Sequence, residues 1–553
     1  MERPWLKNYP KGVSPEVDIN QYQCIGQMFE ETCNQFGPRI AFENMGSILT
    51  FEELEEMSRD FASFFLNVVG LEKGDRVAIQ MPNLLQYPVV MFGALRAGLV
   101  VVNTNPLYTE REMCHQLKDS GAKAIVILAN FAYHLEKIIE KTKITTVVVT
   151  QLGDLLGWPK SLLVNFAVKY IKKMVPTYKL PKTYNFYEAL DLGEEKKFNP
   201  EACQPEDLAF LQYTGGTTGV PKGAMLTHKN ILSNMIQIAE WMKPRLIKGE
   251  EVVITALPLY HIFSLTVNCL SMMYYGSTNI LITNPKDIDG FIKTLKKINF
   301  TFFTGVNTLF NALMNHPDFN QINFKSMKIS VAGGTALQKN VSQEWLKKTG
   351  TPVVEGYGLT EASPVTSCNP TDRTDRVGTI GLPIPNTLMK ICDNNGTPLP
   401  PGQSGELVIY GPQTMKGYWQ KPEETSKVFM PDGGLITGDI AIMDKDGFFK
   451  IVDRKKDMIL VSGFNVYPNE VEGVIALHTK VMEVAAVGVK DEKSGEAVKV
   501  FVVKKDTSLT PEELLDYCRQ NLVAYKIPKH IEFRKELPKT NVGKILHRAL
   551  RKD

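Results

Sequence analysis

Cysteine is scarce in this sequence, and its spacing excludes two common uses of the residue. The 553 residues include eight cysteines, none of which forms a CxxC pair. Zinc sites and dense disulfide frameworks need cysteines at short, regular spacings, so neither is expected. Scattered thiols are typical of reduced, buried cysteines in a cytoplasmic protein. The eight are Cys24, Cys33, Cys114, Cys203, Cys269, Cys368, Cys392 and Cys518.

Other absences narrow the class of protein further. The formal net charge is only +3, which is too small a surplus to predict nucleic-acid binding. The first ten residues carry charges and prolines but no apolar run, so no signal peptide is expected. The longest apolar stretch, residues 87–102, is interrupted by Arg96 and is short for a bilayer span. The sequence therefore predicts a globular protein without a transmembrane helix.

What the sequence does contain is apolar material for several domains, arranged as alternating helices and strands. Its length exceeds that of a single core, and 43% of its residues are hydrophobic. Residues 50–53 (TFEE) form the pattern of a capping box that opens an amphipathic helix. Buried strands are expected at 75–81, 100–103 and 124–129, with a helix at 86–98. This alternation predicts parallel α/β layers.

The second half of the chain changes in character. The connector 398–405 (PLPPGQSG) is rich in turn residues, and short strands follow it. We therefore expect a large N-terminal domain at 1–452 that ends in a β-rich part at about 380–452. The charge run 453–457 precedes a second, small unit, which predicts a C-terminal α+β domain at 453–553. The expected fold class is α/β with several domains.

A basic stretch at residues 155–187 differs from its surroundings. It contains lysines but no Asp or Glu, and its apolar residues recur at roughly helical spacing. A basic amphipathic helix can lie on an anionic membrane surface. An ordinary surface helix packed on its parent domain explains the same pattern, so both alternatives stay open. The lysines are Lys160, Lys169, Lys172, Lys173, Lys179 and Lys182.

The run Tyr213–Gly223 (YTGGTTGVPKG) is the strongest chemical signal. Its glycines let backbone N–H groups approach an anion, its threonines add hydroxyl donors, and Lys222 adds a cation. Such groups suit a triphosphate. The run is not a Walker A loop, because no Gly-Lys-Ser/Thr follows at the required spacing. Its candidate ATP-binding residues are Thr214, Gly215, Gly216, Thr217, Thr218, Gly219 and Lys222.

This run resembles the phosphate loop of the adenylate-forming enzymes. That superfamily includes acyl-CoA synthetases, peptide-synthetase adenylation domains and firefly luciferase. The resemblance can be followed across nearly the whole chain, so it does not depend on one loop. It implies an enzyme that activates a carboxylic acid with ATP in two steps, with ATP, Mg²⁺ and CoA taking part.

A second block, residues 355–361 (EGYGLTE), lacks the final glycine of a dinucleotide-binding fingerprint, which excludes that function. The resemblance implies that the Tyr357 ring packs on the adenine and that Thr360 faces the α-phosphate. It also implies that Glu361, together with Thr217, holds Mg²⁺, which prefers oxygen ligands. The other residues of the block assigned to ATP are Glu355, Gly356 and Gly358.

A third block lies around Asp439 and Arg454. The resemblance implies that Asp439 accepts from the ribose hydroxyls and that Arg454 contacts ribose or phosphate. A Gly-Asp dipeptide alone is more often a turn, so the assignment depends on its place among the motifs. Lys456 matches the hinge about which the C-terminal domain swings between the half-reactions. Ser462 and Gly463 match residues that line the path of the CoA thiol.

The last candidate residues complete the expected catalytic set. Lys544 matches a lysine that neutralises charge as the carboxylate attacks the α-phosphate, which is electrostatic catalysis. His261 matches a position beside the acyl carboxylate, where we expect a positional role. The acyl pocket and adenine site are expected to be lined by Gly305, Gly333 and Gly334. The catalytic residues implied are Lys544, Thr217, Glu361 and His261.

The identity of the acid depends on subtler similarities. Residues 431–457 resemble the signature of fatty acyl-CoA synthetases, although Gly434 and Ile436 replace its Trp and His. Residues 83–106 and 211–228 resemble the long-chain fatty acid–CoA ligases of β-oxidation. The expected function is therefore an ATP-dependent ligase that joins a long-chain fatty acid to CoA through acyl-AMP. A long acyl chain needs an apolar tunnel, whose depth a sequence does not give.

Two alternatives stay open at this point. The chain could be a CoA ligase for medium-chain or aromatic acids, or an acyl-AMP ligase that loads a carrier protein. A catalytically silent binding protein is disfavoured, because Lys544, Glu361 and the phosphate loop are all present. The expected location is the cytoplasm, at the inner face of the cytoplasmic membrane if residues 155–187 bind lipid. Relatives are often dimers, so a homodimer is one expected state, and no nucleic-acid partner is expected.

Overall fold

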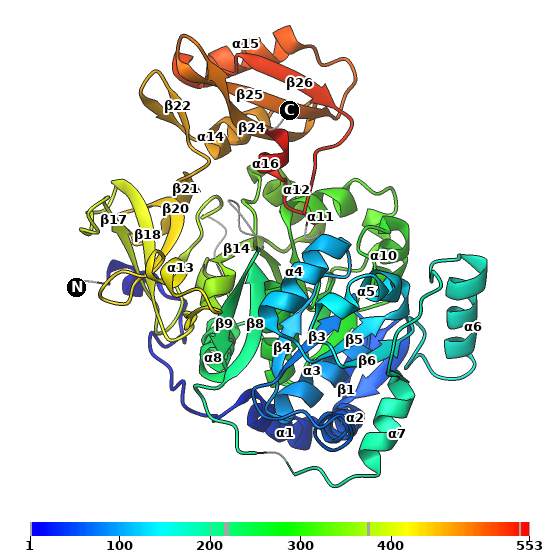
Figure 1. The fold of residues 1–553 in the computed structure, drawn as a ribbon. Coiled ribbons are helices and arrows are strands. Elements are labelled where there is room, and N and C mark those ends of the chain that lie inside the picture. Colours follow the sequence, from blue (N-terminus) through cyan, green and yellow to red (C-terminus); the bar gives the residue numbers. More distant parts are fainter. Residues whose placement is uncertain (1–2, 200, 215–220, 373–375, 541–542, 552–553) are drawn as a thin grey trace.

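The computed structural model describes residues 3–199, 201–214, 221–372, 376–540 and 543–551. Within these ranges the chain forms two large sheets, a four-stranded sheet and a C-terminal unit that stands above the rest (Figure 1). Helices flank the two large sheets, which together make the body of the molecule (Figure 1). The predicted fold class, α/β with several domains, is confirmed.

Continuous buried runs form the centre of the first large sheet. All residues of Val100–Asn103 and Ala124–Leu128 are buried, and both strands pair in parallel with Arg76–Gln80. Such runs are typical of parallel strands that are covered on both faces. The three strands predicted here are confirmed. In the described residues the strand order is β19 (Gly417–Tyr418), β9 (Lys222–Thr227), β8 (Leu208–Thr214), β4 (Val100–Asn103), β3 (Arg76–Gln80), β5 (Ala124–Leu128), β6 (Thr146–Thr150) and β7 (Thr183–Asn185).

The second large sheet presents its strand ends to the candidate site. Its central strands run parallel, so their carboxyl ends lie on one edge, where ligands bind in open α/β sheets. Gly305 ends one of these strands, and Gly333 directly follows another. Its order, counted over the described residues, is β16 (Leu382–Pro383), β15 (Val365–Cys368), β14 (Val353–Gly358), β13 (Ile329–Ala332), β12 (Phe302–Gly305), β10 (Val252–Thr255), β11 (Thr278–Leu281), β1 (Ile40–Asn44) and β2 (Ser47–Thr50).

One hydrophobic core joins the two large sheets. It includes Phe42 from β1 of the second sheet and Ile79 from β3 of the first. Helix α3 (Gln86–Arg96) is buried along its whole length, and α8 (His228–Met242) is buried over most of it. Helices that are enclosed on all sides are typical of the core of a large protein. The two sheets therefore form one body, against which a site at their edge is held rigidly.

Helix α2 (Phe51–Ser63) begins at the predicted capping box. The Thr50 side chain accepts from the backbone N–H of Glu53, and the Glu53 carboxylate accepts from the N–H of Thr50. The prediction from residues 50–53 is thus confirmed. The other helices of the body are α1 (Ile25–Phe36), α4 (Glu110–Ser120), α5 (Ala132–Glu136), α7 (Phe186–Glu194), α9 (Met272–Tyr274), α10 (Ile288–Leu295), α11 (Asn307–Met314), α12 (Lys339–Thr349) and α13 (Pro422–Ser426).

The N-terminal segment holds the β-rich part of the chain. Trp5 is buried and packs edge-on against Phe449, with 6.1 Å between ring centroids. The Asn8 amide donates to the carbonyl of Asp446 at 2.8 Å. The hydroxyl of Tyr9 donates to the carbonyl of Pro383. Over the described residues this part is a four-stranded antiparallel sheet in the order β17 (Leu388–Cys392), β18 (Ser404–Tyr410), β20 (Leu435–Met443) and β21 (Phe449–Arg454).

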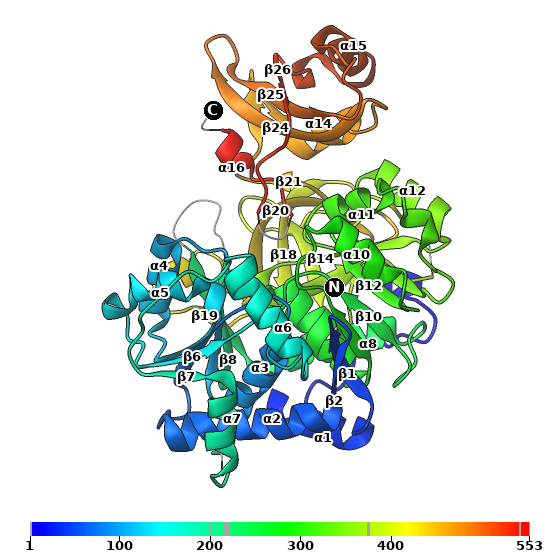
Figure 2. The ribbon, with the colours of Figure 1, turned by 90° about the vertical axis from the view of Figure 1, so that its right-hand side faces the viewer.

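The C-terminal unit has its own sheet and its own core. Strand β21 ends at Arg454, and the first strand of the new sheet begins at Ile459. The unit sits above the carboxyl edge of the body in both views (Figures 1 and 2). In the part of the chain that the structure describes, its elements are β22 (Ile459–Val461), β23 (Phe464–Val466), α14 (Pro468–Ile475), β24 (Val481–Asp491), β25 (Gly495–Lys504), α15 (Pro511–Asn521), β26 (His530–Arg534) and α16 (His547–Leu550).

Residues 155–187 include a short helix that projects from the body, and they end in β7 and the start of α7. Helix α6 (Lys160–Phe166) continues into a turn of π-helix, Ala167–Ile171, and stands apart from the sheets in Figure 1. None of the seven residues of α6, all of them described, is buried. Among the described residues, no helix combines the length and apolar character that crossing a membrane requires.

Candidate active site

The candidate phosphate loop joins two paired strands. Thr214, the last residue of β8, pairs with Lys222, the first residue of β9. The hairpin therefore places both residues at the base of the loop. The loop residues Gly215, Gly216, Thr217, Thr218 and Gly219 lie outside the described residues.

The base of this hairpin is fixed by a buried tyrosine. The Tyr213 hydroxyl donates to Asp119 Oδ2 at 2.7 Å, and burial raises the Tyr213 pKa above its ordinary range. A Cβ on Gly223 would come 3.1 Å from the Tyr213 ring, so the glycine leaves room for it. The carbonyl of Gly223 accepts from the backbone N–H of Trp419 at 2.8 Å. The loop thus starts and ends on anchored backbone.

Lys222 lies in a cluster of charged and aromatic groups. Its Nζ is 2.7 Å from Glu424 Oε2 and 4.6 Å from the centroid of the Tyr418 ring. The Tyr418 hydroxyl donates to Glu361 Oε1 at 2.7 Å. Hydrogen bonds from Lys222 and Lys427 lower the pKa of Glu424 to about 2, so that carboxylate is ionised at neutral pH. The predicted phosphate lysine and the predicted Mg²⁺ ligand are therefore neighbours.

The second predicted block turns sharply at the end of β14. A Cβ on Gly358 would come 2.0 Å from the carbonyl oxygen of Pro364, so only glycine fits. Glu355 is buried and accepts from the N–H of Gly378 at 2.6 Å, and burial raises its pKa to about 7. Gly356 pairs with Cys368 in the neighbouring strand. Thr360 opens the short 3₁₀ turn that carries Glu361.

The second and third blocks meet through their side chains. The Tyr357 hydroxyl donates to Asp439 Oδ2 at 2.5 Å, and Arg454 Nε lies 3.3 Å from Asp439 Oδ1. Asp439 and Arg454 face each other across the antiparallel strands β20 and β21. Burial, followed by the charge of Asp439, raises the Tyr357 pKa well above its ordinary value. Three residues that the sequence predicts for one nucleotide are thus joined by a hydrogen bond and an ion pair.

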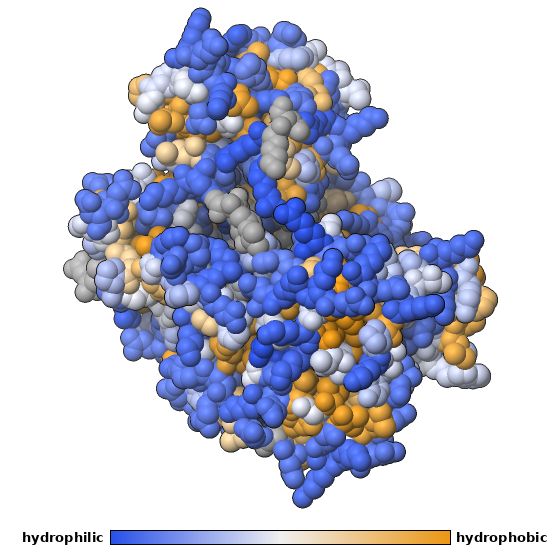
Figure 3. Space-filling view, viewed as in Figure 1, coloured by the Kyte–Doolittle hydropathy of each residue, from blue (hydrophilic) through white to orange (hydrophobic). Residues whose placement is uncertain are grey.

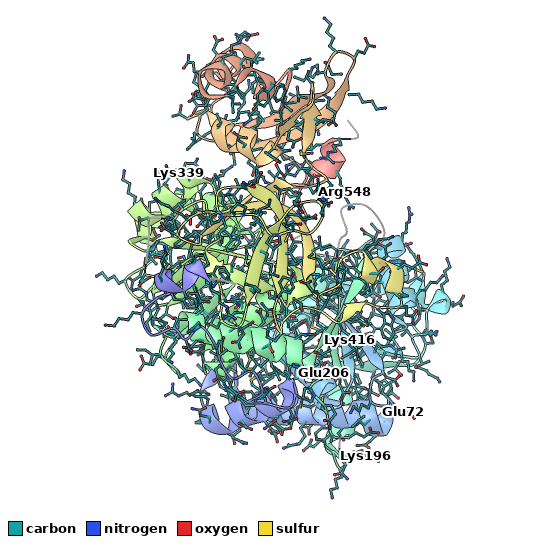
Figure 4. All side chains as sticks on the ribbon, turned by 90° about the vertical axis from the view of Figure 1, so that its left-hand side faces the viewer. Glu72, Lys196, Glu206, Lys339, Lys416 and Arg548 are labelled. Carbon is teal, nitrogen blue, oxygen red and sulfur yellow. The ribbon has the colours of Figure 1, made fainter. Side chains whose placement is uncertain are left out.

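Lys544 reaches this group from the C-terminal unit. Thr308 Oγ1 in α11 donates to the carbonyl of Gly543 at 3.2 Å. A Cβ on Gly334, whose φ is +81°, would lie 3.1 Å from Lys544 Cε, so the lysine stem passes over this glycine. Burial, and then the charge of Arg454, lowers the Lys544 pKa to about 8. Arg548 lies nearby, at the junction of the unit with the body (Figure 4).

His261 lies within electrostatic range of Lys544. Burial, and then the charge of Lys544, lowers the His261 pKa to about 3, so its imidazole is neutral at physiological pH. Two predicted glycines sit beside aromatic rings. A Cβ on Gly333 would come 2.8 Å from Phe263, and one on Gly305 would come 3.0 Å from Phe310. The missing side chains of these glycines let the two rings pack closely against the backbone.

Three further predicted residues follow β21 along the chain. Lys456 follows β21 and, with Arg454, Lys455, Thr437 and Gly438, lines a cavity of about 250 Å³. Burial, and then the charge of Arg454, lowers the Lys456 pKa to about 8. Ser462 and Gly463 lie in the exposed turn between β22 and β23, both with positive φ. The structure does not bring them together with Lys544.

The structure also reveals groups that sequence reasoning missed. Tyr418 and Glu424 contact Lys222, Asp119 supports Tyr213, and Thr308 holds Gly543. Each acts across a long separation in sequence, so local spacing carries no signal for it.

The donor set bears on which metal the site could hold. No cluster of three or more His, Cys, Asp or Glu suited to a metal occurs among the described residues. A single carboxylate, Glu361, fits Mg²⁺, which is usually held by one or two carboxylates plus substrate phosphates.

Comparisons with known proteins agree with this geometry. The AMP-binding enzyme family model matches residues 29–419, and the AMP-binding enzyme C-terminal domain matches residues 470–544. The chain therefore belongs to the AMP-binding enzyme family, and the resemblance to adenylate-forming enzymes is confirmed.

Its relatives narrow the class. The chain is 56% identical over 551 residues to a long-chain-fatty-acid–CoA ligase from Escherichia coli O6:H1, covering 100% of this chain and 98% of that protein. It is 39% identical to a protein of the same name from Bacillus subtilis, covering 99% and 98%. Among solved structures, ATP-bound MatB from Rhodopseudomonas palustris is similar with a TM-score of 0.81 and 28% identity, covering 95% and 98%.

Proposed function

We propose that this protein is an ATP-dependent long-chain fatty acid–CoA ligase. A fatty acid and ATP give acyl-AMP and diphosphate, and acyl-AMP and CoA then give acyl-CoA and AMP. The observation that carries the proposal is the position of Lys544, which comes from the C-terminal unit and lies against Gly334 of the body, where a Cβ on that glycine would come 3.1 Å from Lys544 Cε. Full-length similarity to ligases of this name supports the choice of acid. The acyl-CoA would enter fatty acid β-oxidation.

The first half-reaction needs alignment and charge neutralisation. A carboxylate does not react readily with a thiol, because it is a poor electrophile. Its attack on the α-phosphate of ATP activates it, but this step brings two anions together. Lys222 at the phosphate loop and Lys544 beside the ribose group supply fixed positive charge where negative charge develops. Tyr357 and Asp439 would hold adenine and ribose, and a neutral His261 would position the acyl carboxylate without repelling Lys544.

Glu361 would hold Mg²⁺, which when bound would supply charge stabilisation to the phosphoryl oxygens. Glu361 is suited to this role because its carboxylate is oriented by the Tyr418 hydroxyl. Thr217 is the second ligand that we propose.

The second half-reaction needs a path for the CoA thiol. We propose that the C-terminal unit rotates about Lys456, which withdraws Lys544 and brings Ser462 and Gly463 to the thiol path. Element-terminal residues commonly absorb such dihedral changes, and Lys456 lies just beyond the end of β21. AMP then leaves as the thiol takes the acyl group.

A chain-length series tests the choice of substrate. Purified enzyme with ATP, Mg²⁺ and CoA is expected to form acyl-CoA fastest from C12–C18 fatty acids. Turnover of octanoate or coumarate without product from C12–C18 acids would favour the medium-chain or aromatic alternative. Product only with a carrier protein in place of CoA would favour the acyl-AMP ligase.

We further propose that α6 and its flanks touch an anionic membrane surface from the cytoplasmic side. Large apolar side chains are exposed there beside the six lysines, and Figure 3 shows orange atoms at the outer edge of this projection. Basic residues next to exposed aromatic and aliphatic ones are typical of interfacial helices. The exposed side chains are Trp158 (84%), Leu162 (63%), Leu163 (66%), Phe166 (57%), Tyr170 (58%), Ile171 (70%) and Met174 (52%).

Vesicle binding tests this surface. Replacing the six lysines of residues 155–187 by glutamine is expected to weaken binding to phosphatidylglycerol vesicles and to leave adenylation unchanged. Glutamine at the α12 residues Lys347 and Lys348 serves as a matched control. Unchanged binding would favour a packed surface helix.

A further inference from the structure

A strap formed by residues 415–427 runs between the two halves of the candidate phosphate site. The N–H of Met415 donates to the carbonyl of Glu361 at 2.8 Å, and the N–H of Trp419 donates to the carbonyl of Gly223 at 2.8 Å. The strap is thus bonded to the turn that carries the predicted Mg²⁺ ligand and to the strand that carries Lys222. Its exposed Lys416 marks it in Figure 4.

Tyr418 in this strap contacts both charged groups. Its side chain is buried, with 6% of the residue exposed, and its hydroxyl donates to Glu361 Oε1 at 2.7 Å. Its ring lies 4.6 Å from Lys222 Nζ, within the range of a cation–π interaction. Its own backbone N–H donates to Thr425 Oγ1 at 2.9 Å. Backbone and side chain together fix where this ring lies.

We propose that Tyr418 is a positioning residue for adenylation, which sets Glu361 and Lys222 on either side of the triphosphate. This proposal rests on the function proposed above. The hydroxyl orients one oxygen of Glu361. The ring keeps Lys222 at a set distance from that carboxylate, so the two opposite charges do not collapse onto each other before ATP binds. Before ATP binds, Lys222 pairs with Glu424, with 2.7 Å between Lys222 Nζ and Glu424 Oε2.

The two parts of the Tyr418 side chain have separable effects. Tyr418→Phe removes the hydrogen bond to Glu361 and keeps the ring under Lys222. Tyr418→Leu removes both contacts. If Glu361 acts through Mg²⁺, the hydroxyl matters only when the metal is present, whereas the ring matters with or without it.

Calorimetric titration with ATP tests the proposal without relying on turnover. In Tyr418→Phe, binding of ATP is expected to weaken about tenfold in the presence of Mg²⁺, the effect of one hydrogen bond to a charged group, and to stay unchanged in EDTA. In Tyr418→Leu, binding is expected to weaken in both buffers. Tyr410→Phe is the matched control, because the Tyr410 hydroxyl also donates to a carboxylate, Asp432, at 2.8 Å.

A double variant separates positioning from general damage. In a Glu361→Gln background, Tyr418→Phe is expected to cause no further loss of Mg²⁺-dependent binding. An equal loss in both buffers, or the same loss with and without Glu361, would overturn the proposal and indicate a purely structural tyrosine. Wild-type chain-length data stay independent of these results, so failure of the ligase proposal remains distinguishable from failure of this one.

Discussion

The two halves of the candidate site are held in different ways. In the body, Asp439 has partners in Tyr357 and Arg454, and Glu361 has one in Tyr418. These charges are oriented before ATP arrives, which is how electrostatic catalysis avoids reorganisation during reaction. Lys544 instead comes from a separate unit, and contacts that cross to the body include the bonds Thr308–Gly543 and Asn340–Ala476.

The cores explain this difference. Both hydrophobic clusters of the C-terminal unit consist only of residues from 459 onward. The junction with the body therefore adds little apolar burial, and small polar interfaces between units favour relative motion. The comparison teaches that the residues proposed to bind the nucleotide belong mostly to the body, whereas Lys544 belongs to a unit with a core of its own.

Removing the charge of Lys544 should have the largest effect. Lys544→Ala is expected to lower diphosphate release by about 100- to 1000-fold, because a fixed charge at the developing anion is lost. Thioester formation from supplied acyl-adenylate is expected to stay near wild type, since Lys544 has then been withdrawn. The control is Lys539→Ala, which changes a lysine near Lys544 in sequence that pairs with Glu483 of β24. A loss in both half-reactions would contradict the assignment.

A change at Asp439, which lies in the body, should instead affect both half-reactions. Asp439→Asn removes the ion pair with Arg454 and weakens ribose binding, at a cost of about 10- to 100-fold for a hydrogen bond to a charged group. Acyl-adenylate retains the ribose, so adenylation and thioester formation should fall together in half-reaction assays. Asp444→Asn, which breaks the Asp444–Arg376 pair in the same β-rich part, should leave both rates unchanged.

The pH profile sharpens the comparison further. The Lys544 pKa of about 8 in the free protein means that the lysine is charged below this pH and neutral above it. The kcat/KM for adenylation should therefore fall about tenfold per pH unit above 8. Lys456 has a similar pKa, so both lysines need testing. The alkaline fall should disappear in Lys544→Arg and persist in Lys456→Arg, and the reverse pattern would assign it to the hinge.

The smallest effect is expected at the docking contact. Thr308→Val removes the donor to the Gly543 carbonyl, which is worth about 1 kcal/mol, or about fivefold in docked population. Adenylation should fall by this factor, and ATP binding should not change. Thr294→Val, which removes a hydrogen bond within α10, is the control. Weakened ATP binding would show that Thr308 belongs with the residues that bind the nucleotide.

Much of the fold was predictable because local signals agree with global packing. The strands at 100–103 and 124–129 are runs of apolar, mostly β-branched residues, and both lie in the parallel sheet as expected. The capping box at Thr50 is equally local. The turn of π-helix after α6 and the packing of Trp5 against Phe449 were not predicted, since neither depends on a short sequence pattern.

The candidate site likewise contains residues that local motifs predicted and residues that they did not. Tyr357, Asp439 and Lys544 were predicted from motifs, and the structure brings them into one region. Tyr418 was missed because its partner Glu361 lies 57 positions away. No motif around Tyr418 indicates a chemical role. Supporting groups of this kind become visible only when the chain is folded.

The contacts of Trp5 and Asn8 with the β-rich part have a consequence for biosynthesis. Asn8 bonds to Asp446, which lies 438 positions later. At about 5–20 residues per second, roughly 20–90 seconds of translation separate the two partners. During that interval Trp5 has no aromatic partner at Phe449, and its indole is an exposed apolar group on the nascent chain. The segment around Trp5 is thus made long before its partners, and it closes the β-rich part only after nearly the whole body has been made.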